Sequence, residues 1–279
     1  MNLSLETIDT RLDGHVLYAT FSAPPINLIG PEVVRDLVTL IDTLYAPSPV
    51  RVVVFDSADP DFLFPHVDVT KVAEYTAEAA KAGGPGDSSL GMLFHKLTQA
   101  PVVTITKLRG RARAAGSEFA LACDMRFASR EHAVISQPEV GFGVAPGAGG
   151  IQHLARLLGR GRALEVILSA DDVNADLAER YGWINRALPD AELDDFVDTL
   201  AQRIAGFPLE ALTAAKAAVD AISLPTPDEV RGDAELFQRL LRTDEVGRRA
   251  SLLFERGFQT RGPLELELGA ALVMLAPAD

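Results

Sequence analysis

Two glutamates, Glu118 and Glu139, have the surroundings in this chain that best suit chemistry. Glu118 lies in the run from Ala114 to Cys123, which is otherwise small or apolar, in the first turn of a predicted helix. Glu139 is the only ionisable residue between 133 and 150. Because burying an unpaired carboxylate is costly or raises its pKa, a chain retains one there for a reason. We therefore interpret the two glutamates as a general acid and base.

Each candidate also has a structural interpretation that the sequence leaves open. Glu118 could form a buried ion pair with Arg111 or Arg113, and Glu139 could cap the backbone of the Pro-Gly-Ala-Gly-Gly turn that follows it. His66 has the side chain type that titrates near neutral pH, although a lone histidine is more often a satisfied structural residue.

The elements that must position these residues alternate between strand and helix. Two alternating segments, 3–12 and 16–21, flank Asp13-Gly14 and predict a hairpin. A helix is predicted from Pro31, with Asp68 capping another through about 81 and a further one from about 151. Apolar runs at 50–55, 101–108 and 133–136 are typical of buried strands. Gly83-Gly84-Pro85-Gly86 predicts a flexible break over a pocket.

The pattern changes after Pro189 and becomes almost purely helical. Helices are predicted near 191–205, 209–222, 227–241, 243–257 and 263–274, separated by glycine or proline. We therefore predict a boundary between an α/β part, 1–189, and a helical part, 190–279.

Charge and composition limit the partners. The net charge is −13, from 39 acidic and 26 basic residues, with no sustained basic block, which argues against nucleic acid or an anionic membrane. The sequence has neither a signal-peptide pattern nor an apolar run of about 18 residues, so we expect a cytoplasmic protein with no membrane segment. Cys123 is the single cysteine and is interpreted as core, and the histidines form no spaced cluster, so no metal site is expected.

Several short motifs occur in an order and spacing that carry a resemblance. They are Phe62-Leu63-Phe64-Pro65-His66-Val67-Asp68, Gly110 to Glu118 with Ala122-Cys123-Asp124, Gln137-Pro138-Glu139, Pro146 to Gly150, and Tyr181 to Arg186. Together they make the chain similar to the crotonase superfamily, also called the enoyl-CoA hydratase/isomerase family, over most of its length.

The resemblance implies an α/β fold of the crotonase type, a spiral of β-β-α turns with a C-terminal helical trimerisation region. It implies a spiral core domain at 1–189 and a helical oligomerisation domain at 190–279, assembled as a homotrimer or a dimer of trimers. The substrate would be an acyl-CoA thioester, with coenzyme A as part of the substrate and no separate cofactor.

The resemblance also assigns roles to residues. The backbone N–H groups of Val67 and Ala115 would form an oxyanion hole for the thioester carbonyl, and the predicted helix start at Ala115 agrees with this role. Glu118 and Glu139 would hold the water that adds to the double bond and deliver a proton. The residues expected to bind or tune the substrate are His66, Asp68, Arg111, Arg113, Pro138 and Gly147.

Three functions from different classes follow. The first is an enoyl-CoA hydratase that uses both glutamates. The second is another acyl-CoA reaction, such as isomerisation, decarboxylation or thioester hydrolysis, in which His66, Arg111 and Arg113 reshape the site, since His66 stands where the family usually has glycine. The third is a catalytically inactive oligomer that retains the fold.

Overall fold

The computed structural model describes residues 4–83 and 87–275 and contains two sheets. The six-stranded sheet has the order β1 (Ile8–Asp13), β2 (Val16–Phe21), β3 (Val52–Ser57), β5 (Val103–Leu108), β7 (Met125–Ser129) and β10 (Arg186–Leu188). The four-stranded sheet has the order β4 (Phe62–Phe64), β6 (Arg111–Arg113), β8 (Val134–Ser136) and β9 (Val173–Asn174). The predicted hairpin joins β1 and β2, and Gly14 turns it with φ +58°.

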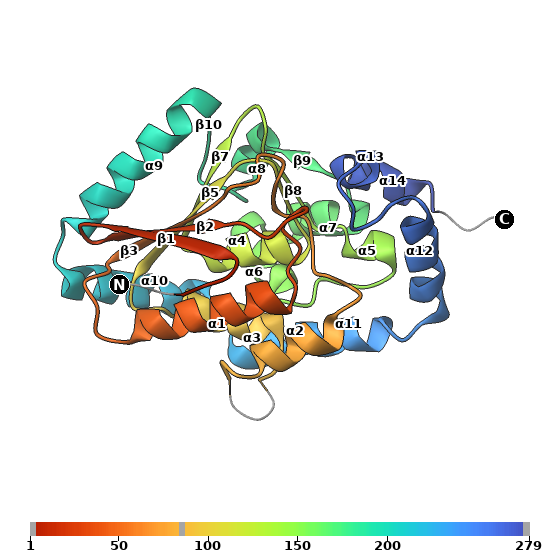
Figure 1. The fold of residues 1–279 in the computed structure, drawn as a ribbon, viewed down its shortest axis with the longest axis horizontal. Helices are drawn as coiled ribbons and strands as arrows, with labels where there is room; N and C mark the ends of the chain where they lie inside the picture. The colour runs from red at the N-terminus through yellow and green to blue at the C-terminus, as the bar shows by residue number, and fades with distance from the viewer. Residues whose placement is uncertain (1–3, 84–86, 276–279) are drawn as a thin grey trace.

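From β3 to β8, successive strands alternate between the two sheets. β3, β5 and β7 pair in parallel in the larger sheet, and the strand that follows each of them, β4, β6 and β8, lies in the smaller one. The helices after β4 and after β6 return the chain to the larger sheet, whereas those after β8 lead to β9 in the smaller sheet (Figure 1). The predicted spiral of β-β-α turns is therefore confirmed.

Helices of the first part surround this spiral. They are α1 (Pro31–Tyr45), α2 (Val72–Ala79), α3 (Leu90–Thr98), α4 (Ala115–Ala122), α5 (Glu139–Phe142), α6 (Gly150–Leu158), α7 (Arg160–Ser169) and α8 (Ala175–Tyr181). The helix α4 is anchored by Phe119, which is fully buried and packs edge-on against the rings of Phe21, Phe55 and Phe64. This packing fixes the helix that carries Glu118.

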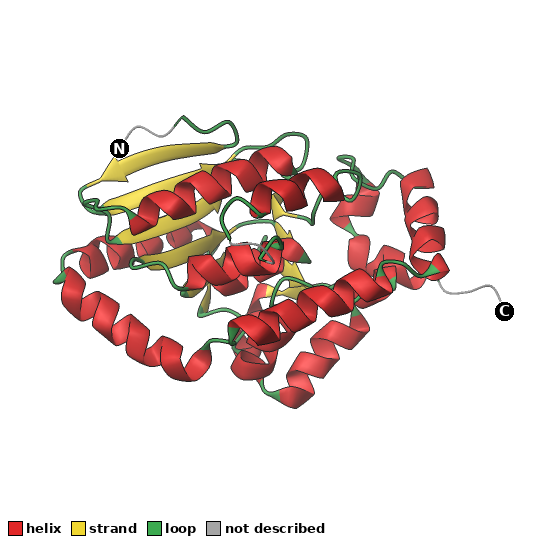
Figure 2. Ribbon diagram, turned by 90° about the horizontal axis from the view of Figure 1, so that it is seen from below, coloured by secondary structure: helices red, strands yellow, loops and turns green. Residues whose placement is uncertain are grey.

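The C-terminal helices lie close to their predicted ranges. They are α9 (Asp190–Ala205), α10 (Leu209–Ser223), α11 (Pro227–Leu240), α12 (Asp244–Glu255), α13 (Pro263–Leu266) and α14 (Leu268–Val273). Apolar residues of α9, including Leu193 and Val197, pack on the six-stranded sheet against Val16 and Val52. The helix α9 thus belongs to the packing of the core, whereas α11 packs against α3 and α12 against α5. Figure 2 shows helices on both sides of the strands.

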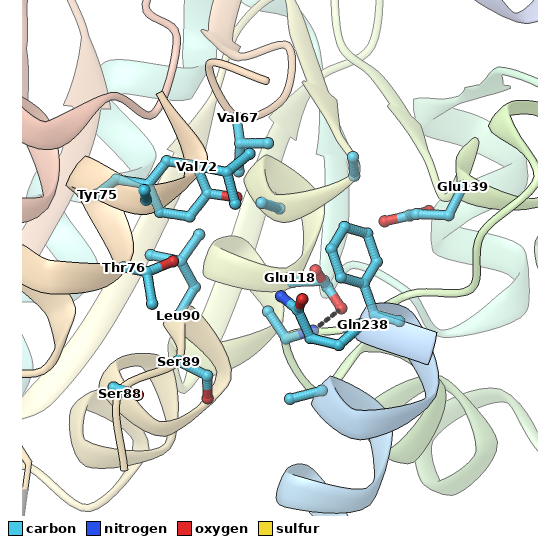
Figure 3. A pocket seen from close by; sticks show the side chains of 17 residues that line it. Val67, Val72, Tyr75, Thr76, Ser88, Ser89, Leu90, Glu118, Glu139 and Gln238 are labelled. Carbon is cyan, nitrogen blue, oxygen red and sulfur yellow. Dashed lines mark hydrogen bonds between the residues drawn. The ribbon is translucent and has the colours of Figure 1, made fainter. Parts of the chain in front are cut away.

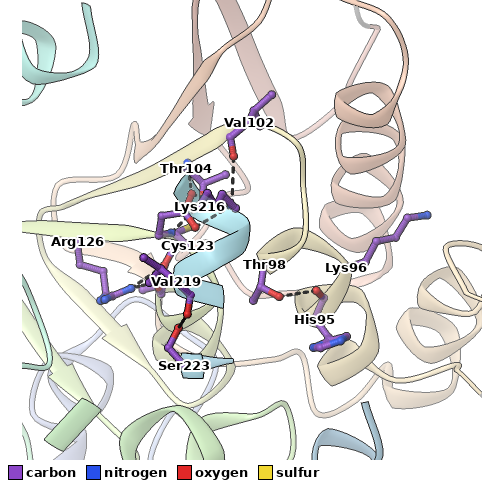
Figure 4. A network of polar contacts seen from close by, with 12 residues as sticks. His95, Lys96, Thr98, Val102, Thr104, Cys123, Arg126, Lys216, Val219 and Ser223 are labelled. Atoms are coloured by element: carbon purple, nitrogen blue, oxygen red, sulfur yellow. Dashed lines mark hydrogen bonds and ion pairs between the residues drawn. The ribbon is translucent and has the colours of Figure 1, made fainter. Parts of the chain in front are cut away.

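The helix α10 is tied to the sheet by a polar contact. Lys216 donates from Nζ to the carbonyl of Val102 at 3.2 Å and to the carboxylate of Asp124 at 2.7 and 2.8 Å (Figure 4). Cys123 lies nearby, and its complete burial raises the pKa of the thiol to about 12. A thiol with so high a pKa is unreactive at neutral pH, which supports the prediction that Cys123 is a core residue.

The predicted flexible break at Gly83-Gly84-Pro85-Gly86 falls largely on residues 84–86, which lie outside the described part of the chain. Asp68 does not cap α2 itself: its carboxylate accepts hydrogen bonds from Thr70, in the turn that precedes this helix. Within residues 4–83 and 87–275, no helix is long and apolar enough to cross a membrane.

Candidate active site

A cavity of about 600 Å³ lies among α2, the loop before α3, α4, the loop before α6, and α11 (Figure 3). It is lined by Val67, Val72, Ala73, Tyr75, Thr76, Ser88, Ser89, Leu90, Ala114, Ala115, Glu118, Glu139, Gly147, Ala148, Ala234, Phe237 and Gln238. Most of this surface is apolar, and among the described lining residues the two glutamates are the only acidic groups. This is the composition expected of a pocket that holds a largely apolar ligand beside a few polar groups.

Glu118 is held in the cavity by backbone donors. Its Oε1 accepts hydrogen bonds from the N–H groups of Ala148 at 2.7 Å and Gly150 at 2.9 Å. A Cβ on Gly150 would lie only 2.9 Å from that same oxygen, so a glycine is needed for the approach. Burial raises the pKa of Glu118 to about 7, against the lowering effect of the two N–H groups, and the charge of Asp233 adds to the increase.

Glu139 is the first residue of α5 and is also buried. The side-chain amide of Gln137 donates to its Oε1 at 3.3 Å. Burial raises the pKa of Glu139 well above its usual value, and the nearby charge of Glu118 raises it further. Two neighbouring carboxyl groups in an apolar cavity resist a second ionisation, so the pair holds one proton over a range of pH.

The structural alternatives for the two glutamates do not apply. Arg113 pairs with Asp172, with Nη2 2.6 Å from Oδ2, and Arg111 donates from Nε to the carbonyl of Leu266 at 2.9 Å. The Pro-Gly-Ala-Gly-Gly turn donates its N–H groups to Glu118 rather than to Glu139. Both glutamates are thus left facing the cavity.

The two predicted oxyanion donors, Val67 and Ala115, also line the cavity. The carbonyl of His66 accepts from the N–H of Ile29 at 3.0 Å, and the N–H of Asp68 donates to the carbonyl of Ile29 at 3.0 Å. In an extended strand, alternate residues direct their polar groups to opposite edges, so the N–H of Val67 points away from Ile29.

The second donor begins α4. As the first residue of this helix, Ala115 has an N–H without an intrahelical acceptor, at the positive end of the helix dipole. Ala114 makes the turn into the helix with φ +49° and ψ −127°, which is an unfavourable conformation for a residue with a Cβ. The cavity therefore combines two candidate oxyanion donors with two carboxyl groups.

Other predicted site residues are placed elsewhere. Gly147 lines the cavity as predicted, but the described cavity wall does not include His66, Asp68, Arg111, Arg113 or Pro138. His66, Arg111 and Arg113 contact Glu265 or Leu266 of α13 instead. The carboxylate of Asp68 accepts hydrogen bonds from Thr70 and Gln259. Pro138 is the residue before α5. None of the five is part of the described cavity wall, so their role in binding or tuning the substrate stays a prediction.

Sequence reasoning missed one wall of the cavity. Ala234, Phe237 and Gln238 come from α11, and Tyr75 and Thr76 come from α2. The first three have the spacing of one helical face, which was visible as a pattern. That pattern could not show which cavity the face would cover, because α11 is more than a hundred residues from Glu118 in sequence.

The chain belongs to the enoyl-CoA hydratase/isomerase family, whose model matches residues 11–257. It is 30% identical over 204 residues to the short-chain-enoyl-CoA hydratase of Clostridium acetobutylicum, covering 72% of this chain and 76% of that protein. It is 34% identical over 174 residues to the crotonyl-CoA hydratase of Syntrophomonas wolfei, covering 61% and 63%.

Solved structures agree with this assignment. A candidate enoyl-CoA hydratase from Streptomyces avermitilis superposes with a TM-score of 0.97 at 69% identity, over 98% of both chains. An enoyl-CoA hydratase from Mycobacterium avium, at 21% identity and a TM-score of 0.78, shares the fold. The resemblance inferred from the motifs, and the crotonase-type fold that it implied, are confirmed.

Proposed function

We propose that this protein is an enoyl-CoA hydratase, which adds water across the double bond of a 2-enoyl-CoA. The observation that carries the proposal is the pair of buried carboxyl groups, Glu118 and Glu139, in one cavity with the N–H groups of Val67 and Ala115. The family supplies the substrate class, and the cavity supplies the groups that the reaction requires.

The thioester carbonyl would lie between the N–H groups of Val67 and Ala115. As the water oxygen bonds to the β-carbon, electrons move toward the carbonyl oxygen, and the two N–H dipoles stabilise the resulting enolate. Because these donors are fixed by the strand and by the helix start, they need no reorganisation as the charge develops.

The environments of the two carboxyl groups suggest their roles. Two backbone N–H groups stabilise the charged form of Glu118, so Glu118 takes a proton from the attacking water. Glu139 accepts only a longer hydrogen bond from Gln137, and the charge of Glu118 raises its pKa. Glu139 therefore carries the proton that is delivered to the α-carbon. The hydroxyl group of the water and the proton of Glu139 are thus added, and the proton that Glu118 took from the water then passes to Glu139 and restores the starting state.

In the second function, another acyl-CoA reaction, His66, Arg111 and Arg113 would reshape the site. These side chains contact Glu265 and Leu266 and are not part of the described cavity wall, which favours the hydratase over this alternative. The third, an inactive oligomer, is disfavoured by the presence of a cavity that both glutamates line.

We further propose a homotrimer or a dimer of trimers, with helices after residue 189 forming the contacts, in a cytoplasmic protein of fatty acid metabolism. Support for the assembly comes from α10, where Val219 and Ile222 are exposed, by 59% and 88%. Apolar residues exposed on one helix often mark a protein interface. Light scattering on the purified protein tests this, and a monomer of 29.9 kDa would contradict it.

The test of the reaction is the loss of enoyl absorbance of crotonyl-CoA with the wild type, Glu118→Gln and Glu139→Gln. Each substitution retains the shape of the side chain and removes its acid–base function, so kcat is expected to fall by about a hundredfold to ten-thousandfold. Full activity in both variants would contradict the assignment of the pair. Binding of crotonyl-CoA without hydration by the wild type would contradict the proposed reaction itself.

A further inference from the structure

Glu265, in α13, contacts the residues that lie next to both oxyanion donors, His66 and Arg113. Figure 1 shows α13 and α14 near α5 and β9. Glu265 of α13 is completely buried, and its carboxylate accepts from Nε2 of His66 at 3.0 Å and from the N–H of Gln259 at 2.7 Å. A carboxylate buried this deeply is stable only when its partners are well placed.

His66 connects this carboxylate to the first donor. Its Nδ1 lies 2.8 Å from the carbonyl oxygen of Val67 and donates to it, because a carbonyl can only accept. The ring also stacks on Phe258, with 4.4 Å between ring centroids. The C=O and N–H of Val67 point to the same edge of the strand, so fixing the carbonyl also fixes the direction of the N–H.

The same glutamate reaches the second donor through its backbone. Arg113, two residues before Ala115, donates from Nη1 to the carbonyl of Glu265 at 2.5 Å. Arg113 is fully buried, and Asp172 holds the other side of its guanidinium at 2.7 and 2.6 Å. The strands β4 and β6, which lead to the two donors, are neighbours in the smaller sheet.

We propose that Glu265 is a positioning residue for the oxyanion hole, acting through His66 on Val67 and through Arg113 on Ala115. This inference rests on the proposed function, because it takes these two N–H groups as the donors to the thioester. Neither Glu265 nor His66 lines the cavity, so their effect is on where the donors lie, not on contact with substrate.

The test compares Glu265→Gln with Glu267→Gln, its matched control. Both substitutions remove one negative charge, but Glu267 is exposed and lies after α13. The readout is isotope-edited infrared spectroscopy of bound butyryl-CoA with a ¹³C-labelled thioester carbonyl. This saturated ester cannot be hydrated, and hydrogen bonds from the donors lower its carbonyl stretching frequency.

Glu265→Gln is expected to lose at least half of the frequency shift that the wild type imposes, while Glu267→Gln retains it. With crotonyl-CoA, kcat of Glu265→Gln should fall by roughly tenfold to a hundredfold, because misplaced donors lose transition-state stabilisation, whereas KM changes by less than about threefold. A purely structural role would lower the melting temperature without changing the frequency shift in the folded protein.

Two variants of His66 test the connection even if Glu265→Gln does not fold. His66→Asn places an amide N–H where Nδ1 was and retains the bond to Val67, whereas His66→Gln places it near Nε2 and loses that bond. We expect His66→Gln to lose more of the frequency shift than His66→Asn. In the His66→Gln background, Glu265→Gln should then have little further effect, since only the route through Arg113 remains.

The inference would be overturned if Glu265→Gln kept the wild-type frequency shift, or if the two His66 variants gave equal shifts. It would also be overturned if the effects of Glu265→Gln and His66→Gln on kcat were independent, so that the double variant showed their product. The failure of the hydratase proposal looks different. In that case the wild type would polarise the butyryl-CoA carbonyl, and Glu265→Gln would reduce the shift, but crotonyl-CoA would not be hydrated.

Discussion

Replacing Glu118 by glutamine should stabilise the fold at and above neutral pH while it removes activity. Burial raises the pKa of Glu118 from 4.5 to about 7. The unfolded chain therefore releases this proton at a lower pH than the folded protein does, so the folded state loses stability as the pH rises from about 4.5 to 7. At about 1.4 kcal/mol per pKa unit, the loss at pH 8 is roughly 3 kcal/mol.

Glutamine still offers an oxygen to the N–H groups of Ala148 and Gly150 but has no proton to release. The gain in unfolding free energy of Glu118→Gln should thus be near zero at pH 4.5, increase through pH 6, and level off at roughly 3 kcal/mol above pH 7. The substitution should therefore raise the unfolding free energy while it lowers activity. This relation is expected where a functional group is kept in surroundings that destabilise the folded protein.

The assay is urea unfolding of both proteins at pH 5, 6, 7 and 8. Glu235→Gln is the matched control, because Glu235 is an exposed glutamate on α11 and its replacement should give no gain that increases with pH. Equal stability of Glu118→Gln and the wild type at pH 8, or a gain of the same size at every pH, would refute the reasoning about burial.

Two further predictions concern the backbone around the cavity. Ala114→Gly should stabilise the protein by about 1 kcal/mol in urea unfolding, because relief of the strained turn outweighs the added freedom of the unfolded chain. A loss of stability would contradict the inference that this turn is strained. Gly147→Ala places a Cβ 2.6 Å from Cβ of Phe237 and should destabilise by roughly 1–3 kcal/mol and raise KM for crotonyl-CoA. Gly161→Ala, in open space on α7, is its control and should do neither.

Local patterns predicted most of the elements because the physics that produces them is local. The apolar spacing after Pro31 and the turn at Asp13-Gly14 fix a helix and a hairpin over a few residues. The breaks after residue 189 likewise marked the later helices to within a few residues. The same reasoning identified Glu118 as a candidate, because an ionisable residue within an apolar helix is unusual whatever the tertiary contacts of that helix are.

Long-range packing decided which polar residues face the cavity. Arg113 was predicted to bind or tune the substrate because it brings positive charge to the loop before Glu118, and His66 because it lies beside Val67. Their side chains turn away from the cavity because Glu265, more than 150 residues further along the chain, offers buried acceptors there. No local pattern indicates such a partner.

The sequence by itself determined the family, many of the strands and helices, and Glu118 and Glu139 as the candidate acid and base, since each of these depends on residue types at short spacing. Only the tertiary structure decided that Glu118 receives two backbone N–H groups, that α11 closes the cavity and that α13 supports the donor strands. These contacts join segments far apart in the chain, and their energies depend on distance and burial in the folded protein.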